Sequence, residues 1–200
     1  MSWLIALGVI VGVPLLLAMF AAGIFNRLVT LKNRYVNAFS QIEIQLKRRY
    51  DLIPNLVEVA KTYMAHERDT LEAVVKARAL AVSGLQNAAA NPGDPQAMQA
   101  LSGAESGLTS VLGKLFAVAE AYPDLKANQN MMQLSEEITS TENKVSFARQ
   151  AYNDAATEYN TYKQTFPPVV VAGMFGHSQN AELLQFDSAA IADAPKVNFS

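Results

Sequence analysis

The residues of this chain that come closest to a catalytic motif are His66 and Glu67, which begin like the zinc-binding helix of a metalloprotease. That motif needs a second histidine four residues after the first, so that both imidazoles face the metal from one side of the helix. Thr70 occupies this position. The spacing therefore argues against a zinc protease, and we expect His66 to be a surface or interhelical side chain.

A di-iron carboxylate centre is the second chemistry that a helical chain could support. Such a centre needs two Glu-x-x-His repeats, but Tyr63 stands where the glutamate before His66 would have to be. The chain has no cysteine, which excludes thiolate metal sites, disulfides and a lipid attached to cysteine. Nucleophile elbows and phosphate-binding glycine loops are also missing. We therefore expect no enzyme, no metal and no cofactor.

A line of polar side chains is the remaining candidate site. Arg149, Asn153 and Asn160 follow one side of an apolar helical stripe, and Arg49 interrupts a similar stripe earlier in the chain. The carboxylates that could pair with one of these arginines are Asp51, Glu58, Glu137 and Glu142. Such residues either bond helix to helix and set the register of a bundle or form a docking surface for a partner. We favour the interhelical network.

The first 25 residues determine where these elements must lie. Ser2 to Phe25 contains no charged side chain, and a helix of this length spans ~36 Å, enough to cross a hydrocarbon core of ~30 Å. A cleaved signal peptide would need a basic start, and Met1 to Leu4 carries no charged side chain. The pattern predicts a permanent single-pass membrane anchor.

Basic residues are concentrated directly after the apolar segment, where Glu43 is the single acid. The expected membrane-proximal basic collar consists of Arg27, Lys32, Arg34, Lys47, Arg48 and Arg49. Such a collar suits anionic lipid head groups, at about 1 kcal/mol per cation near the surface, although a solvated helix face is an equal alternative. Because flanking cations tend to stay in the cytoplasm, the pattern predicts a cytoplasmic domain.

Two glycines within the apolar segment bear on self-association. Gly8 and Gly12 form a small-xxx-small pair, which lets the backbones of two membrane helices approach closely. Glycine is common in membrane helices, so the pair is a weak signal alone. Together with the long apolar stripes it favours a homo-oligomer.

Apolar residues at alternating steps of three and four predict three long helices after the anchor. The first covers 26–85 and contains Pro54, which should kink the helix without ending it. A turn at 91–95 leads to a helix over 95–121, and a third helix runs from about 124 to 166. The apolar stripe of the third helix consists of Met131, Leu134, Ile138, Thr141, Val145, Ala148, Tyr152, Ala155, Tyr159, Tyr162 and Phe166. A stripe of this length must be buried against other helices.

An apolar tail follows the paired prolines that end the third helix. It is too apolar for a disordered end, and we expect it to pack without helical structure on the bundle or on a neighbouring subunit. The residues expected at an oligomer contact are Val169, Val171, Phe175 and Phe186.

Several motifs distributed along the chain resemble the LemA family of bacterial membrane proteins. They are the stretch 45–57 with the following His66-Glu67, the stretch 122–128, the stretch 142–153 with 159–160 and 166–167, and the closing 195–199. The resemblance implies an N-terminal membrane helix on an antiparallel helical bundle, with no established enzymatic activity. Family members with a lipid-bearing cysteine differ from this chain, which must rely on its helix.

The expected fold class is therefore all-α: an N-terminal transmembrane helix followed by an antiparallel bundle of long helices, of the four-helix-bundle type. The expected units are an anchor over 1–25, a bundle over 26–166 and a non-helical tail over 167–200. With the resemblance, we expect a single-pass, membrane-anchored, self-associating scaffold that organises or shapes the bacterial cytoplasmic (inner) membrane. The alternative is a monomeric tethered adaptor that docks a protein partner. Membrane lipids and further copies of the chain are the expected partners, and nucleic acid is not.

Overall fold

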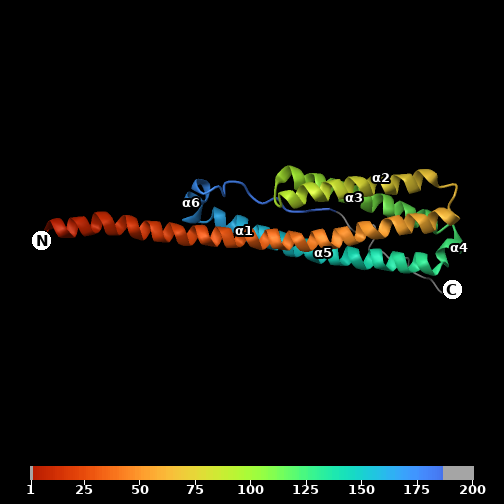
Figure 1. The fold of residues 1–200 in the computed structure, drawn as a ribbon, viewed down its shortest axis with the longest axis horizontal. Helices are drawn as coiled ribbons and strands as arrows, with labels where there is room; N and C mark the ends of the chain where they lie inside the picture. Colours follow the sequence, from red (N-terminus) through yellow and green to blue (C-terminus); the bar gives the residue numbers. More distant parts are fainter. Residues whose placement is uncertain (1, 187–200) are drawn as a thin grey trace.

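Figure 1 shows a computed structural model that describes residues 2–186, and the expected closing motif at 195–199 lies outside them. Within this range the chain forms helices and no strand, so the all-α fold is confirmed. The elements are α1 (Ser2–Tyr63), α2 (Arg68–Ala90), α3 (Pro95–Ala119), α4 (Pro123–Lys126), α5 (Gln129–Gln164) and α6 (Pro168–Met174).

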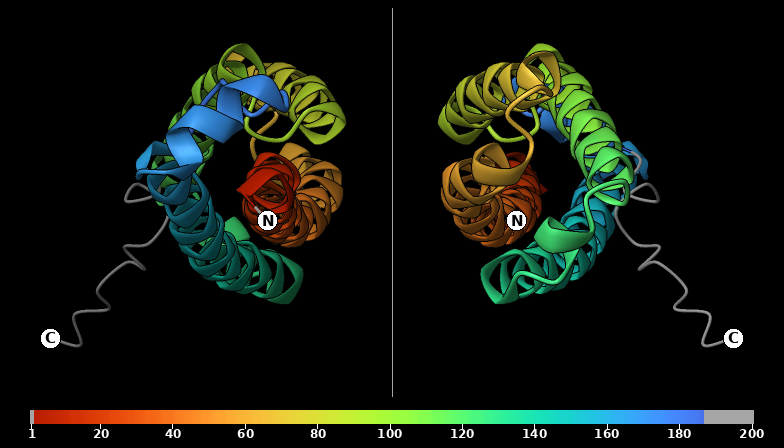
Figure 2. Two further views of the ribbon diagram at one scale, coloured as in Figure 1. Left: turned by 90° about the vertical axis from the view of Figure 1, so that its left-hand side faces the viewer. Right: turned by 90° about the vertical axis from the view of Figure 1, so that its right-hand side faces the viewer.

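The long helices run antiparallel to their neighbours along the chain. The second half of α1 packs most extensively on α5, while α2 and α3 form a helical hairpin that closes the other side of the bundle (Figures 1 and 2). The N-terminal part of α1 projects beyond the bundle, at the end where α6 lies (Figure 1).

The anchor and the first helix of the bundle are one continuous helix. Pro54 lies inside α1, as predicted. The prediction of one helix over 26–85 is wrong, because residues 64–67 form a turn between α1 and α2. No proline or glycine marks this turn, and the apolar stripe resumes after it. The chain reverses there because α2 then packs against α1 and α3 and buries its apolar face within the same subunit.

Local side-chain chemistry explains the other turns. The carboxylate of Asp94 accepts a hydrogen bond from the Ala97 amide at 2.9 Å and caps α3, and Asn128 caps α5 through Met131 at 3.1 Å. Gly93 has a φ of +89°, and a Cβ there would lie 3.2 Å from the Tyr35 ring. Glycine is therefore required on both conformational and steric grounds.

The core is an apolar and aromatic seam between α1 and α5. Ile138, Val145, Tyr152 and Tyr159 are buried, as predicted, whereas Phe166, expected at the end of the stripe, is 83% exposed. The Tyr152 ring lies 5.7 Å from that of Phe39, and the Tyr159 ring lies 5.3 Å from that of Tyr35. The stripe ends early because α5 ends at Gln164, before Phe166.

The tail differs from the expected non-helical segment. Its first part forms the short helix α6, in which Pro168 occupies the first turn, where a missing N–H costs no helical hydrogen bond. After α6 the chain runs without regular secondary structure to residue 186 and returns along the bundle (Figure 1). The Glu182 amide donates to the Gly93 carbonyl at 2.9 Å, so the tail reaches the turn between α2 and α3.

Candidate functional site

The apolar start of α1 has almost no contact with the rest of the chain. Its most apolar 18-residue window has a mean hydropathy of 2.7, and none of that window is buried within the chain. By length and composition this segment can cross a membrane. Ideal Cβ atoms at Gly8 and Gly12 would meet nothing within 4 Å, so both glycines are free to face lipid or another helix.

Three cations follow the apolar segment most closely, and two of them pair with the same carboxylate. Arg27 and Arg34 pair with Glu158 of α5 at 3.0 and 2.5 Å, and all three side chains are 40–55% exposed. Lys32 is exposed beside them. These three cations therefore lie directly beyond the end of the apolar segment, and two of them also connect α1 to α5.

The other half of the expected collar lies further along α1. Lys47 follows Phe25 by 22 residues in one continuous helix, which places it about 33 Å further along the axis. This distance exceeds the Debye length of about 8 Å, so Lys47 and Arg48 are electrostatically separate from the cations at the end of the apolar segment. Arg49 is fully buried in the bundle. The collar prediction is therefore wrong for Arg49, whereas it stays a prediction for Lys47 and Arg48, which are exposed further along α1.

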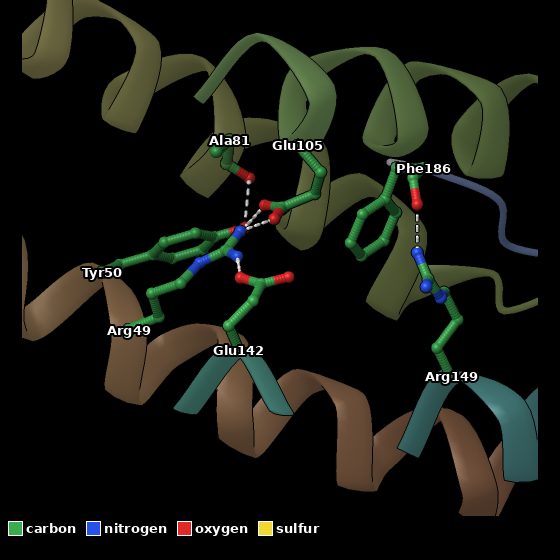
Figure 3. Close-up of polar contacts among 7 residues, drawn as sticks. All are labelled: Arg49, Tyr50, Ala81, Glu105, Glu142, Arg149 and Phe186. Atoms are coloured by element: carbon green, nitrogen blue, oxygen red, sulfur yellow. Dashed lines mark hydrogen bonds and ion pairs between the residues drawn. The ribbon is translucent and has the colours of Figure 1, made fainter. Parts of the chain in front are cut away.

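Arg49 is the centre of a buried polar cluster (Figure 3). Its guanidinium donates to Glu105 of α3 through Nη2 and to Glu142 of α5 through Nη1, and all three side chains are at most 2% exposed. Burial lowers the pKa of Arg49 to about 10, which still leaves the guanidinium charged near neutral pH. The cluster joins three helices, and the geometry required by two carboxylates on one guanidinium sets their register.

Tyr50 extends this cluster to α2. Its hydroxyl donates to Glu105 and lies 3.3 Å from the Ala81 carbonyl of α2 (Figure 3). Burial raises the pKa of this phenol, so the hydroxyl keeps its proton and remains a donor. Arg78 of α2 donates to the backbone carbonyl of Tyr50 at 2.7 Å. All four long helices therefore meet at one polar centre.

The sequence pattern places Arg49 and Glu142 in one network but does not predict the other carboxylate paired with Arg49, Glu105. Asp51 is exposed, and Glu137 accepts from Gln133 of its own helix at 3.2 Å, so neither carboxylate reaches Arg49. Glu105 was overlooked. It lies in register with Leu101 and Leu108 on the buried side of α3, and a carboxylate within an apolar stripe is the signal that could have identified it.

Arg149, Asn153 and Asn160 form a polar ladder along α5, and this ladder binds the tail. Asn160 donates to the Ala181 carbonyl at 2.9 Å and accepts from the Ala181 amide at 2.8 Å. Asn153 makes the same pair of bonds with Leu184, at 3.0 and 2.9 Å. Both asparagines were expected to bond helix to helix. They bond to the tail because an extended backbone offers an unpaired donor and acceptor on one edge.

The spacing of the ladder matches an extended chain. Asn153 and Asn160 are seven helical residues apart, about 10.5 Å, and Ala181 and Leu184 are three extended residues apart, about 10 Å. Arg149 continues the series, since it donates to the Phe186 carbonyl and its guanidinium lies 4.5 Å from the Phe186 ring centroid (Figure 3). The face of α5 thus binds an antiparallel extended segment mainly through the backbone of that segment.

Three further side chains of α5 form hydrogen bonds with the tail. Tyr152 donates to the Glu182 carbonyl at 2.6 Å, and Lys163 donates to the Ser178 carbonyl at 3.2 Å. His177 is buried, with Nδ1 2.9 Å from the Tyr159 hydroxyl. Burial lowers the pKa of His177, and the nearby cations Lys32 and Lys163 lower it further, so the ring is neutral near pH 7.

The four residues expected at an oligomer contact have different environments. Phe186 is 8% exposed against its own chain, so it cannot face a neighbour in this arrangement. Val171 is half-buried, whereas Val169 and Phe175 are about half exposed, at 51% and 48%. The tail was expected to fold back or to cross over, and up to residue 186 it folds back.

His66 lies in the turn between α1 and α2 and is exposed. Within residues 2–186, no three side chains of histidine, cysteine, aspartate or glutamate converge as metal ligands would. The polar centre joins the four long helices, and the asparagines of α5 bond to the tail backbone, so these contacts hold the bundle and its tail together.

Fold and site together define a membrane-associated helical protein, in which a bare apolar helix end continues into a bundle held by a polar centre and a clasped tail. The chain belongs to the LemA family, whose family profile matches residues 38–199.

Relatives agree with this assignment. The chain is 30% identical over 141 residues to "Protein LemA" of Metamycoplasma hominis, covering 70% of this chain and 60% of that protein. It is 25% identical over 181 residues to "Magnetosome protein MamQ" of Magnetospirillum gryphiswaldense, covering 78% of this chain and 66% of that protein. "Magnetosome protein MamQ 2" of Paramagnetospirillum magneticum is 25% identical over 154 residues, covering 68% and 56%. The chain thus spans about 60% of the length of these relatives.

Proposed function

We propose that this protein is a membrane-anchored helical scaffold that self-associates and organises or shapes the bacterial cytoplasmic membrane. The observation that carries the proposal is the continuity of α1 from Ser2 to Tyr63. A flexible linker would let the bundle move independently of its anchor. A continuous helix instead transmits the orientation of the membrane segment to the bundle, as a scaffold requires.

Two further features support a structural role. The side chains of the polar centre bond to one another, an arrangement suited to stability rather than to turnover. Relatives of the chain are named magnetosome proteins, after a cellular structure, and none of the relatives' names denotes a reaction.

Self-association is proposed through the glycine-bearing face of the apolar segment. Gly8 and Gly12 would meet no atom of their own chain even with a Cβ, so a larger side chain there has no cost within the subunit. Close helix packing between two copies would place these positions in contact. Of the four tail residues expected at an oligomer contact, Val169 and Phe175 are about half exposed and could make an additional contact.

The test is size-exclusion chromatography with light scattering of the full chain in detergent. We expect a homogeneous assembly that Gly12→Leu shifts to smaller species. Ala6→Leu, in the same exposed segment but on the opposite side of the helix, should leave the assembly intact. A monomeric full-length protein would overturn the scaffold, as would equal behaviour of the two variants.

Orientation with the bundle in the cytoplasm is proposed from Arg27, Lys32 and Arg34, which directly follow the apolar segment. Because the chain has no cysteine, Asn143→Cys on the exposed side of α5 supplies a single label. A membrane-impermeant maleimide should leave this cysteine unlabelled in intact spheroplasts and label it after lysis. Labelling of intact spheroplasts would place the bundle outside the cytoplasm.

A monomeric adaptor is the alternative, and one observation favours it. An open pocket between the ends of α1 and α2 farthest from the membrane segment is lined by Val57, Leu71 and Val75 together with the charged Lys61 and Glu72. Such a mixed apolar and charged surface could accept a protein partner. A monomer in the light-scattering experiment would favour this function over the scaffold.

A further inference from the structure

The short helix α6 lies where the apolar segment of α1 ends. The ring of Phe25, the last residue of the uncharged stretch, lies 5.3 Å from the ring of Phe175, the residue after α6. Ile24 is 5% exposed, whereas most residues of α1 before it are exposed, and Ala172 of α6 is 2% exposed. Figure 1 shows α6 beside α1 at the end of the bundle from which the N-terminus projects.

The outer face of α6 is apolar and unprotected. Val170 is 60% exposed and Met174 78%, and Phe166, just before the helix, is 83% exposed. No aspartate, glutamate, lysine or arginine occurs between Lys163 and Glu182. Elsewhere on the bundle, large exposed apolar side chains such as Leu80 and Phe147 are spread over different helices. A cluster of this kind in water marks a surface that is normally covered.

The position of the cluster identifies what covers it. If α1 spans the bilayer up to Phe25, a helix packed on its last turn lies at the boundary between hydrocarbon and head groups. Apolar side chains at this level are buried about 5–10 Å into the interface by surface-bound helices. Lys32 and Arg27 follow on α1, where head-group phosphates would be. The exposed face of α6 is therefore continuous with the lipid-facing surface of α1.

We propose that α6, together with Phe166, is a second membrane contact. Its apolar face inserts into the leaflet on the side of the membrane where the bundle lies. This inference rests on the proposed membrane span. With one contact the membrane segment and the bundle could rotate and tilt in the bilayer together, as one rigid body. A second contact from the end of α5 fixes which side of the bundle faces the lipid surface. The antiparallel pair α1 and α5 then stands on the membrane in one orientation.

The experiment uses single cysteines in this cysteine-free chain, each labelled with the environment-sensitive dye NBD. Val170→Cys reports on α6, Val11→Cys reports on the span, and Leu80→Cys is the matched control on α2. All three side chains are 60–67% exposed within the chain, so the label should not disturb folding. The full-length protein is reconstituted into phosphatidylcholine–phosphatidylglycerol vesicles with or without doxyl-labelled lipids.

We expect blue-shifted emission and strong doxyl quenching at positions 11 and 170, and water-like, unquenched emission at position 80. If the label at position 170 has the water-like, unquenched emission of the label at position 80 while the label at position 11 is quenched, the second contact is wrong and the membrane span is supported. Blue-shifted emission at position 170 without lipid quenching would show contact with another copy, and would also overturn the inference. An unquenched position 11 would overturn the proposed membrane span itself.

Discussion

Arg78 donates a hydrogen bond of 2.7 Å to the backbone carbonyl of Tyr50, and this is the carbonyl that Pro54 leaves without a helical partner. In an α-helix the amide of residue 54 would bond to the carbonyl of residue 50, but proline has no N–H. A side chain from α2 thus replaces the lost bond. Pro54 leaves one backbone carbonyl of α1 without a helical donor, and Arg78 of α2 supplies the donor. This bond lies next to the buried Arg49.

The first prediction follows from this replacement. Arg78→Met should destabilise the bundle by about 1–3 kcal/mol, because it leaves a part-buried carbonyl unsatisfied. In a Pro54→Ala background the restored backbone amide at position 54 should take over that carbonyl, and Arg78→Met should then cost clearly less. Chemical unfolding followed by circular dichroism in detergent would measure the four proteins of this double-mutant cycle. Additive costs would show that the two residues are not coupled.

The second prediction concerns the buried charge cluster. Arg49→Met should cost about 3–5 kcal/mol of unfolding free energy, because it leaves Glu105 and Glu142 buried without their cation. Adding Glu105→Gln and Glu142→Gln to this variant should recover a large part of the loss. Arg48→Met is the matched control, since Arg48 is exposed beside Arg49, and should change the free energy of unfolding by less than about 0.5 kcal/mol. Equal effects of Arg48→Met and Arg49→Met would contradict the cluster.

The third prediction concerns the tail. Asn153→Ala removes two hydrogen bonds to Leu184, so the tail should detach more often while the helices stay folded. We expect faster thermolysin cleavage at Leu183 and Leu184, with an unchanged helical circular dichroism signal. Asn143→Ala, an exposed asparagine on the same helix, is the control. Identical cleavage rates for the two variants would mean that the ladder does not hold the tail.

The fourth prediction is a loss of stability in mild acid that depends on His177. Its pKa is lower in the folded protein than the unfolded value of about 6.5, because the ring is buried and faces Lys32 and Lys163. The neutral ring therefore contributes stability above about pH 6.5, and this contribution is lost as the pH falls through the folded value. His177→Gln should show a smaller loss between pH 7.5 and 5 than the wild type. His66→Gln, at the exposed histidine, should behave as the wild type, and a reversed order would sink the assignment.

Features that arise from neighbouring residues were readable in the sequence. The uncharged stretch up to Phe25, the inner face of α5 and the turn at 91–95 depend on composition, helical period and turn chemistry. These signals are local: the uncharged stretch is helical, a turn separates α2 from α3, and the inner face of α5 is mostly buried except at its predicted end, where Phe166 is exposed. The continuity of α1 through Pro54 was also predictable, because the apolar stripe keeps its phase across the proline.

Pairings between distant segments were decided by the tertiary structure. Residues 64–67 turn although no helix-breaking residue marks them, because α2 buries its apolar face by packing back on α1 and α3. Glu105 joins Arg49 because packing of α3 brings its one buried carboxylate to the guanidinium. Asn153 and Asn160 bond to backbone atoms of the tail, and backbone atoms carry no residue-type signature. Helical period shows which side of a helix is buried, but the group that lies opposite depends on how the folded chain brings distant segments together.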